Sequence, residues 1–314
     1  MKFKSRILIL ISCLTAGLAP SAGYACACGC GVFEVGTSSM LPEGAGSTLF
    51  LEDDFQDQDQ NWSGSSGAPA AANPDKDIRT NFLTAGFQDM FSRSWGLQLE
   101  VPYESRSFQT TGGASGNDLV ALKWSGVGDL RLQGLYTGFS RDLSTGVNFG
   151  VKLPTGSYTH NDAFGDIDRD SEIGTGSTDL LLGGFHRGLL SGDPRWTWFV
   201  QAELDLPVLS RDQYRPGLEA DAALGVYFTG WSIGPVSVTP VLEVKGSDRA
   251  RDTGMNAADP VASGFQRVLL APGLEFNLHP VTVYADVERH VYQHFTGNQL
   301  SAPALFKVSV SYMF

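Results

Sequence analysis

The chain has 314 residues, of which 42% are hydrophobic and 11% aromatic, and its formal net charge at pH 7 is −12. A protein this acidic does not bind the phosphate backbone of nucleic acids nonspecifically, so no nucleic-acid partner is expected. The 37 glycines and the aromatic content suit a β-barrel with tight turns and aromatic girdles, or a secreted β-sandwich, and composition alone does not separate these classes.

Residues 1–25 have the pattern of a secretory signal peptide. Lys2, Lys4 and Arg6 precede an apolar run, and small residues follow up to Ala25, after which we expect cleavage. The run is shorter than the roughly 20 residues of a membrane-spanning helix, and no later stretch is longer. If the chain crosses a membrane, it must do so as a closed barrel, because lipid cannot satisfy open backbone groups.

A Cys- and Gly-rich extension over residues 26–46 follows the predicted cleavage site and carries Cys26, Cys28 and Cys30. Thiolates this close together suit a soft metal ion such as Cu(I) or Zn(II). The alternatives are a disulfide that leaves one thiol free, a lipid on Cys26, or a bond from the odd thiol to a periplasmic partner. No cysteine follows residue 30, so we expect neither a disulfide framework nor a cofactor in the rest of the chain.

Residues 47–314 contain twelve segments in which apolar and polar residues alternate. In one of them, Val147, Phe149 and Val151 oppose Asn148 and Lys152. Alternation with a period of two places apolar side chains on one face of a strand and polar side chains on the other. Each segment is about as long as a tilted strand that crosses a membrane. The predicted strands are 47–55, 79–91, 95–106, 127–139, 144–154, 177–187, 195–208, 218–229, 235–246, 265–277, 280–292 and 304–314.

The connections between these strands alternate between short and long. This alternation is typical of an all-β, up-and-down antiparallel transmembrane β-barrel, with short periplasmic turns and long external loops. The even strand count predicts that both termini are periplasmic and that the protein lies in lipid, in the outer membrane of a Gram-negative bacterium. The longer predicted loops are 56–78, 107–126, 155–176 and 247–264.

The last strand ends on an aromatic residue, as the closing strands of outer-membrane barrels do. We expect residues 304–314 to pair with the first strand around Leu49 and Leu51 and so to close the barrel. Tyr312 and Phe314 are then the signal that the β-barrel assembly machinery recognises. Deleting Phe314 is expected to impair assembly before it affects transport.

Three glycine-rich stretches resemble the outer-membrane proteins grouped under the phenol meta-degradation pathway name. They read Gly126-Val-Gly-Asp129-Leu-Arg131-Leu, Gly150-Val-Lys152-Leu-Pro-Thr-Gly156 and Gly174-Thr-Gly-Ser-Thr-Asp179-Leu. The resemblance covers most of the predicted barrel. It implies an outer-membrane transporter of small solutes, including hydrophobic or aromatic ones. The Cys-x-Cys-x-Cys start departs from the family's general pattern and suggests a subgroup with an additional N-terminal function.

The period-two pattern also predicts which charged side chains face the barrel interior. A mixed acidic and basic interior has two interpretations, a salt-bridged filling or the polar lining of a solute path, and both stay open. Acidic loop residues such as Asp170 and Glu172 are expected to be solvated and to raise the cation concentration at the external mouth. The predicted lumen-lining residues are Glu100, Arg131, Gln133, Lys152, Glu203, Asp205, Asp221, Glu243, Lys245, Arg267, Glu275, Asp286, Glu288 and Lys307.

The leading functional hypothesis is an outer-membrane channel or transporter for small solutes. The alternative is a barrel that anchors a thiol-rich, metal-binding or electron-transfer segment for a periplasmic partner. Enzymatic activity is not expected, because no serine stands in a Gly-x-Ser-x-Gly nucleophile motif and the five histidines are scattered.

Overall fold

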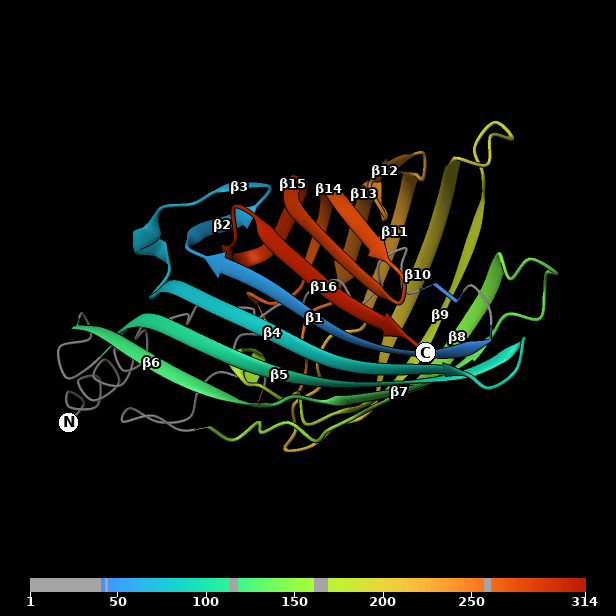
Figure 1. Cartoon of the computed structure of the whole chain (residues 1–314). Coiled ribbons are helices and arrows are strands. Elements are labelled where there is room, and N and C mark those ends of the chain that lie inside the picture. Colours follow the sequence, from blue (N-terminus) through green and yellow to red (C-terminus); the bar gives the residue numbers. More distant parts are fainter. Residues whose placement is uncertain (1–40, 43–44, 113–117, 161–168, 257–260) are drawn as a thin grey trace, which may run out of the picture.

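The computed structural model describes residues 41–42, 45–112, 118–160, 169–256 and 261–314. Twelve antiparallel strands form a closed barrel, which confirms the predicted fold class and strand count (Figure 1). In order around the barrel they are β1 (Gly46–Gln58), β4 (Asp75–Met90), β5 (Trp95–Gly112), β7 (Leu130–Tyr136), β8 (Thr145–Leu153), β9 (Thr178–Leu189), β10 (Trp196–Leu209), β11 (Glu219–Phe228), β13 (Val236–Arg249), β14 (Phe265–Leu278), β15 (Val281–Ser301) and β16 (Leu305–Met313).

The barrel closes where the first strand meets the last. In the β1–β16 register, Leu49 lies opposite Tyr312 and Leu51 lies opposite Val310, which confirms the predicted pairing. Beyond β16, the Phe314 N–H donates to the Ser47 carbonyl at 2.9 Å and the Ser47 N–H donates to the Phe314 carbonyl at 3.2 Å. The C-terminal residue is therefore part of the hydrogen-bonded seam.

The two ends of the barrel differ in the length of their connections, as the sequence predicts. Short connections join β4 to β5, β7 to β8, β9 to β10, β11 to β13 and β14 to β15, and we call this the short-turn end. The opposite end, the long-loop end, carries the β8–β9 loop and the segment between β1 and β4. That segment holds β2 (Gln60–Gly64), β3 (Ser66–Gly67) and the 3-10 helix η2 (Ala70–Ala72).

One predicted loop is wrong: residues 107–126 contain the end of β5 and an additional strand, β6 (Asp118–Val127). β6 pairs with residues 103–112 of β5, at the long-loop end, while β7 pairs with residues 95–100. Leu122 and Trp124 lie on the inner face of β6, whereas Lys123 and Ser125 lie on its outer face. A polar outer face does not suit lipid, so this hairpin projects beyond the membrane at the long-loop end.

The barrel exterior carries an apolar belt. On each strand, exposed large apolar side chains alternate with side chains that face the interior. Together they form the surface that the hydrocarbon of a bilayer covers. None of the helices in the described part of the chain is long and apolar enough to cross a membrane. The belt includes Leu49, Leu51, Phe87, Leu97, Leu99, Leu132, Phe149, Leu182, Val200, Leu204, Leu224, Leu242, Leu270, Leu274, Val308 and Val310.

Aromatic side chains gather at the short-turn end of this belt. They lie at strand ends, where the ring of one strand packs on the ring of a neighbour. This is the position of the aromatic girdle that marks the membrane–water interface in outer-membrane barrels. The cross-strand ring pairs include Trp95–Tyr136 and Trp196–Phe228, with centroids 4.7 and 4.8 Å apart, and the rings of Tyr312 and Phe314 lie 6.1 Å apart at the end of the last strand.

Deleting Phe314 tests the seam. The deletion removes two backbone hydrogen bonds to Ser47 and an exposed ring of the girdle, so we expect less folded barrel in the outer membrane. Heat-modifiable migration of membrane fractions measures the folded share, and Phe314→Tyr, which keeps both backbone bonds and an aromatic ring, is the control. Wild-type folding of the deletion would contradict the seam's role in assembly.

Candidate functional site

A cavity of about 230 Å³ lies inside the barrel. Its walls come from β1, β4, β5, β7, β8, β9, β10 and β11, from Arg249 of β13, and from segments at both barrel ends. Among the described residues, no part of the lining comes from β14, β15 or β16. The cavity therefore occupies one side of the barrel interior.

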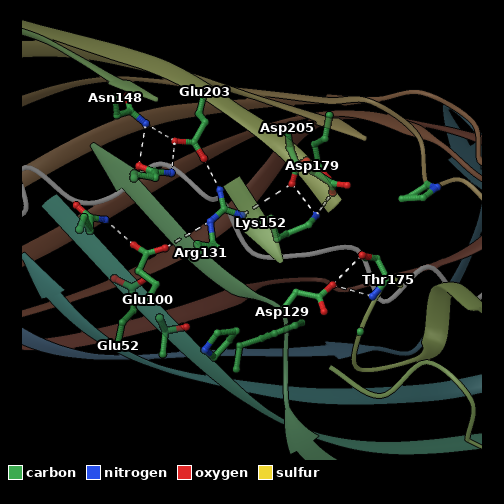
Figure 2. A pocket seen from close by; sticks show the side chains of 18 of the residues that line it. Glu52, Glu100, Asp129, Arg131, Asn148, Lys152, Thr175, Asp179, Glu203 and Asp205 are labelled. Carbon is green, nitrogen blue, oxygen red and sulfur yellow. Dashed lines mark hydrogen bonds and ion pairs between the residues drawn. The ribbon is translucent and has the colours of Figure 1, made fainter. Parts of the chain in front are cut away.

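The cavity wall is built around Arg131, which projects inward from β7 (Figure 2). Its guanidinium forms an ion pair with Glu203 of β10 and lies 3.4 Å from the Glu100 carboxylate of β5. Gln133 and Asn148 also donate to the Glu203 carboxylate, Gln133 at 3.1 Å. Side chains from four strands thus meet at one buried cation.

Lys152 of β8 extends this network, which we call the Arg131 network. Its ammonium lies 2.6 Å from the Asp179 carboxylate of β9 and 2.7 Å from the Asp205 carboxylate of β10. Asp205 also lies 3.9 Å from Arg131, so the two cations share one carboxylate (Figure 2). The Arg131 network comprises Glu100, Arg131, Gln133, Asn148, Lys152, Asp179, Glu203 and Asp205.

A second group of charges fills the opposite side of the interior. The Lys245 ammonium of β13 lies 2.7 Å from Glu288, 3.2 Å from Asp286 and 3.4 Å from Glu243. The Lys307 ammonium of β16 lies 2.8 Å from Glu52 and 3.4 Å from Asp54. Both lysines are fully buried. We call these seven residues the lysine network; only Glu52 also lines the cavity.

The predicted interior residues divide between the two networks, with three exceptions. Asp221 accepts a hydrogen bond from Ser247, and the Arg267 guanidinium lies 4.7 Å from the ring centroid of Phe265. Both are buried, whereas Glu275 is half-buried near the short-turn end of β14.

Several interior charges were missing from the prediction, and five of them show why. Glu52 and Asp54 alternate with the exterior Leu49 and Leu51 on β1, so the period-two pattern contained the signal for both. Asp179 lies at the start of β9, where polar and apolar residues alternate in the same way. The other two follow the same pattern, because Arg106 shares the inward face of Glu100 on β5 and Asp129 lies two residues before Arg131.

Asp129 joins the three glycine-rich stretches. Its carboxylate accepts the N–H of Gly156 at 2.9 Å, the N–H of Thr175 at 2.9 Å and the Thr175 hydroxyl at 2.7 Å. Gly156 and Gly174 approach so closely that a Cβ on Gly174 would collide with the Gly156 backbone. The stretches therefore form the anchor that holds both ends of the β8–β9 loop (Figure 2).

The β8–β9 loop also reaches the interior, where Arg106 holds it. The Arg106 guanidinium donates to the carbonyls of Ser171 and Glu172, the latter at 3.1 Å, and pairs with Glu104 at 3.2 Å. Asp170 and Glu172 line the cavity. The prediction that these two carboxylates are solvated is wrong, because the loop folds inward over the barrel opening.

A stack of side chains bounds the cavity at the long-loop end. The Arg169 guanidinium, in the 3-10 helix η3 (Arg169–Ser171), lies between the rings of Tyr158 and Tyr214, 4.6 and 4.7 Å from their centroids. The Tyr214 hydroxyl donates to Asp252 at 2.8 Å. Burial, reinforced by the Asp252 charge, raises the pKa of Tyr214 above its usual value, so the phenol stays protonated as a donor.

Leu41 and Pro42 bound the cavity at the short-turn end. The Leu41 side chain is buried among Phe199, Val241 and Tyr284, and the Pro42 carbonyl accepts a hydrogen bond from Arg187 at 3.1 Å. Both residues also line the cavity. Residues 41 and 42 therefore lie inside the barrel at this end.

The predicted metal site cannot be placed, because Cys26, Cys28 and Cys30 lie outside the described residues. Within the described ranges, no group of three or more His, Cys, Asp or Glu side chains could hold a metal ion.

No protein-family model matches this sequence, and no curated protein matches it. The fold is similar to that of the COG4313 outer membrane channel from Pseudomonas putida F1, with a TM-score of 0.66 and 12% identity over 90% of this chain and 100% of that chain. It is also similar to the β domain of the Bordetella autotransporter BrkA, with a TM-score of 0.52 and 14% identity over 86% of this chain and 100% of that chain.

These likenesses establish the fold and not a family, so the phenol meta-degradation grouping and its cysteine subgroup stay predictions. The closed barrel, its apolar belt and its aromatic girdle place the protein in the outer membrane of a Gram-negative bacterium.

Lys307→Met tests the lysine network. The substitution leaves Glu52 and Asp54 buried without their cation, and removing one partner of a buried ion pair costs about 3–5 kcal/mol. Urea unfolding of barrels refolded into lipid vesicles measures the loss. Lys123→Met, on the exposed face of β6, is the matched control and should change stability by less than about 0.5 kcal/mol. Equal effects of the two substitutions would refute the network's role.

Asp129→Ala tests the anchor of the β8–β9 loop. Three donors lose their acceptor, so we expect the loop to leave the barrel opening more often and trypsin to cleave after Arg169 faster than in the wild type. Limited proteolysis of refolded barrels is the measurement. Asp142→Ala, which removes a carboxylate from an exposed short turn, should leave that cleavage rate unchanged. An unchanged rate in Asp129→Ala would rule out the anchor.

Proposed function

We propose that this protein is an outer-membrane channel or transporter for small solutes. The observation that carries the proposal is the cavity of about 230 Å³ inside a closed barrel, next to a filled side that holds the lysine network. A barrel that served only as an anchor would have no need of an interior space bounded by an inward loop at one end and by Leu41 and Pro42 at the other.

The lining of the cavity suits solutes with both polar and apolar groups. The Arg131 network supplies donors and acceptors in its middle. Phe50, Leu135 and Phe185 line it towards the short-turn end, together with Leu41. An apolar or aromatic group fits against these side chains, in agreement with the solute class that the family resemblance implies.

The orientation of the barrel in the outer membrane is part of the same proposal. With the start of β1 and the C-terminal residue at the short-turn end, that end faces the periplasm and the long-loop end faces outward. Solutes then enter past the β8–β9 loop and leave past Leu41 and Pro42.

Leu41→Ala tests both the channel and its periplasmic boundary. The substitution removes packing against Phe199, Val241 and Tyr284, so we expect a larger single-channel conductance than in the wild type. Recording from planar bilayers measures it, and liposome swelling with small neutral and aromatic solutes measures their passage. Leu49→Ala, on the lipid-facing side of β1, is the matched control and should conduct like the wild type. No current and no solute flux in any of the three proteins would overturn the proposed function.

The second candidate function is a barrel that presents Cys26, Cys28 and Cys30 to a soft metal ion or a periplasmic partner. These residues lie outside the described part of the chain, so the support is the spacing of the thiols alone. Stoichiometric Cu(I) binding that disappears when all three become serine would favour it. Unchanged metal binding and partner capture in the serine variant would exclude it.

A further inference from the structure

The lining of the cavity is strongly acidic. Ten of the residues that line it are Asp or Glu, and five are Arg or Lys. The walls beyond them are either apolar strand faces that meet lipid or the filled side of the barrel. Carboxylates in such surroundings must be compensated, because an unpaired charge away from bulk water is costly. The five lining cations, together with Lys307 beside Glu52, are fewer than the ten carboxylates, so the lining carries a formal net negative charge.

One buried carboxylate leaves an acceptor for a cation from solution. Asp179 is fully buried and lines the cavity, and its Oδ1 accepts no hydrogen bond. Its partner Lys152 is shared with Asp205, whose Oδ1 also accepts none. Arg131, 3.9 Å from Asp205, also pairs with Glu100 and Glu203, so two cations serve four carboxylates at this point of the wall (Figure 2).

The boundary of the cavity at the long-loop end already holds one cation, the guanidinium of Arg169. The Arg169 guanidinium lies between the faces of Tyr158 and Tyr214, and Asp170 beside it lines the cavity. Aromatic faces attract cations and not anions. Arg169 already occupies these two ring faces, so the group at this boundary that can attract an entering cation is the Asp170 carboxylate beside it.

We propose that the channel selects cations over anions, and that small cationic solutes are the class that passes. This inference rests on the proposed function and narrows it. The determinants are the carboxylates of the cavity wall, among them Glu100, Glu104 and Asp179. The carboxylates of the lysine network other than Glu52, such as Glu243, do not contribute, because they do not line the cavity.

Reversal potentials across a KCl concentration gradient test the proposal. In planar bilayers that hold the full-length mature protein, we expect K⁺ to be at least about ten times as permeant as Cl⁻, because a cleft lined by one sign of charge concentrates counter-ions by that factor or more. In the double variant Glu100→Gln, Glu104→Gln the ratio should fall towards unity. Glu243→Gln removes a carboxylate from the same interior but from the filled side, and it should keep the wild-type ratio.

The outcomes separate the inference from the proposed function. A current with a permeability ratio near or below one in the wild type would overturn cation selectivity and leave the channel intact. A ratio that falls equally in Glu243→Gln and in the double variant would overturn the assignment to the cavity wall. Absence of current from the wild type and from Leu41→Ala would overturn the proposed channel function and, with it, the proposed cation selectivity.

Discussion

The compensation of charge inside a closed barrel is the constraint on which the rest of this structure depends. Lys245 and Lys307 lie where neither lipid nor bulk water can solvate them, so each is surrounded by carboxylates from neighbouring strands. These contacts connect β1, β13, β15 and β16, the strands that flank the closing seam. The filled side of the interior thereby supports the place where the first and last strands meet.

The other side of the interior satisfies the same constraint less completely, and this is where the cavity lies. Arg131 and Lys152 hold the carboxylates of three strands in place, but the acidic side chains around the cavity outnumber the basic ones. The inward β8–β9 loop, anchored by Asp129 and Arg106, covers one end of this space. A rigid wall of paired charges with a loop above it is an arrangement that admits solutes selectively while the barrel stays closed.

The sequence contained most of the barrel and about half of the site. Alternation predicted the twelve strands, the seam and inward charges such as Arg131 and Lys307, because lipid outside and polar groups inside impose one rule on every residue between the membrane boundaries. The rule failed for β6, whose polar Lys123 faces outward and whose Trp124 faces inward, since that strand lies beyond the membrane. It also could not predict the inward β8–β9 loop, because the contacts of Asp129 with Gly156 and Thr175 join stretches that are distant in the sequence.

The central claim is that one side of the barrel interior is filled and the other is open to solutes. Thiol accessibility tests it most directly, with Thr84→Cys on the cavity wall and Ser309→Cys on the filled side, in a background where Cys26, Cys28 and Cys30 are serine. In folded barrels, a small water-soluble thiol reagent should label the cysteine at position 84 rapidly and the one at position 309 only after denaturation. Equal labelling of the two folded variants would contradict the account.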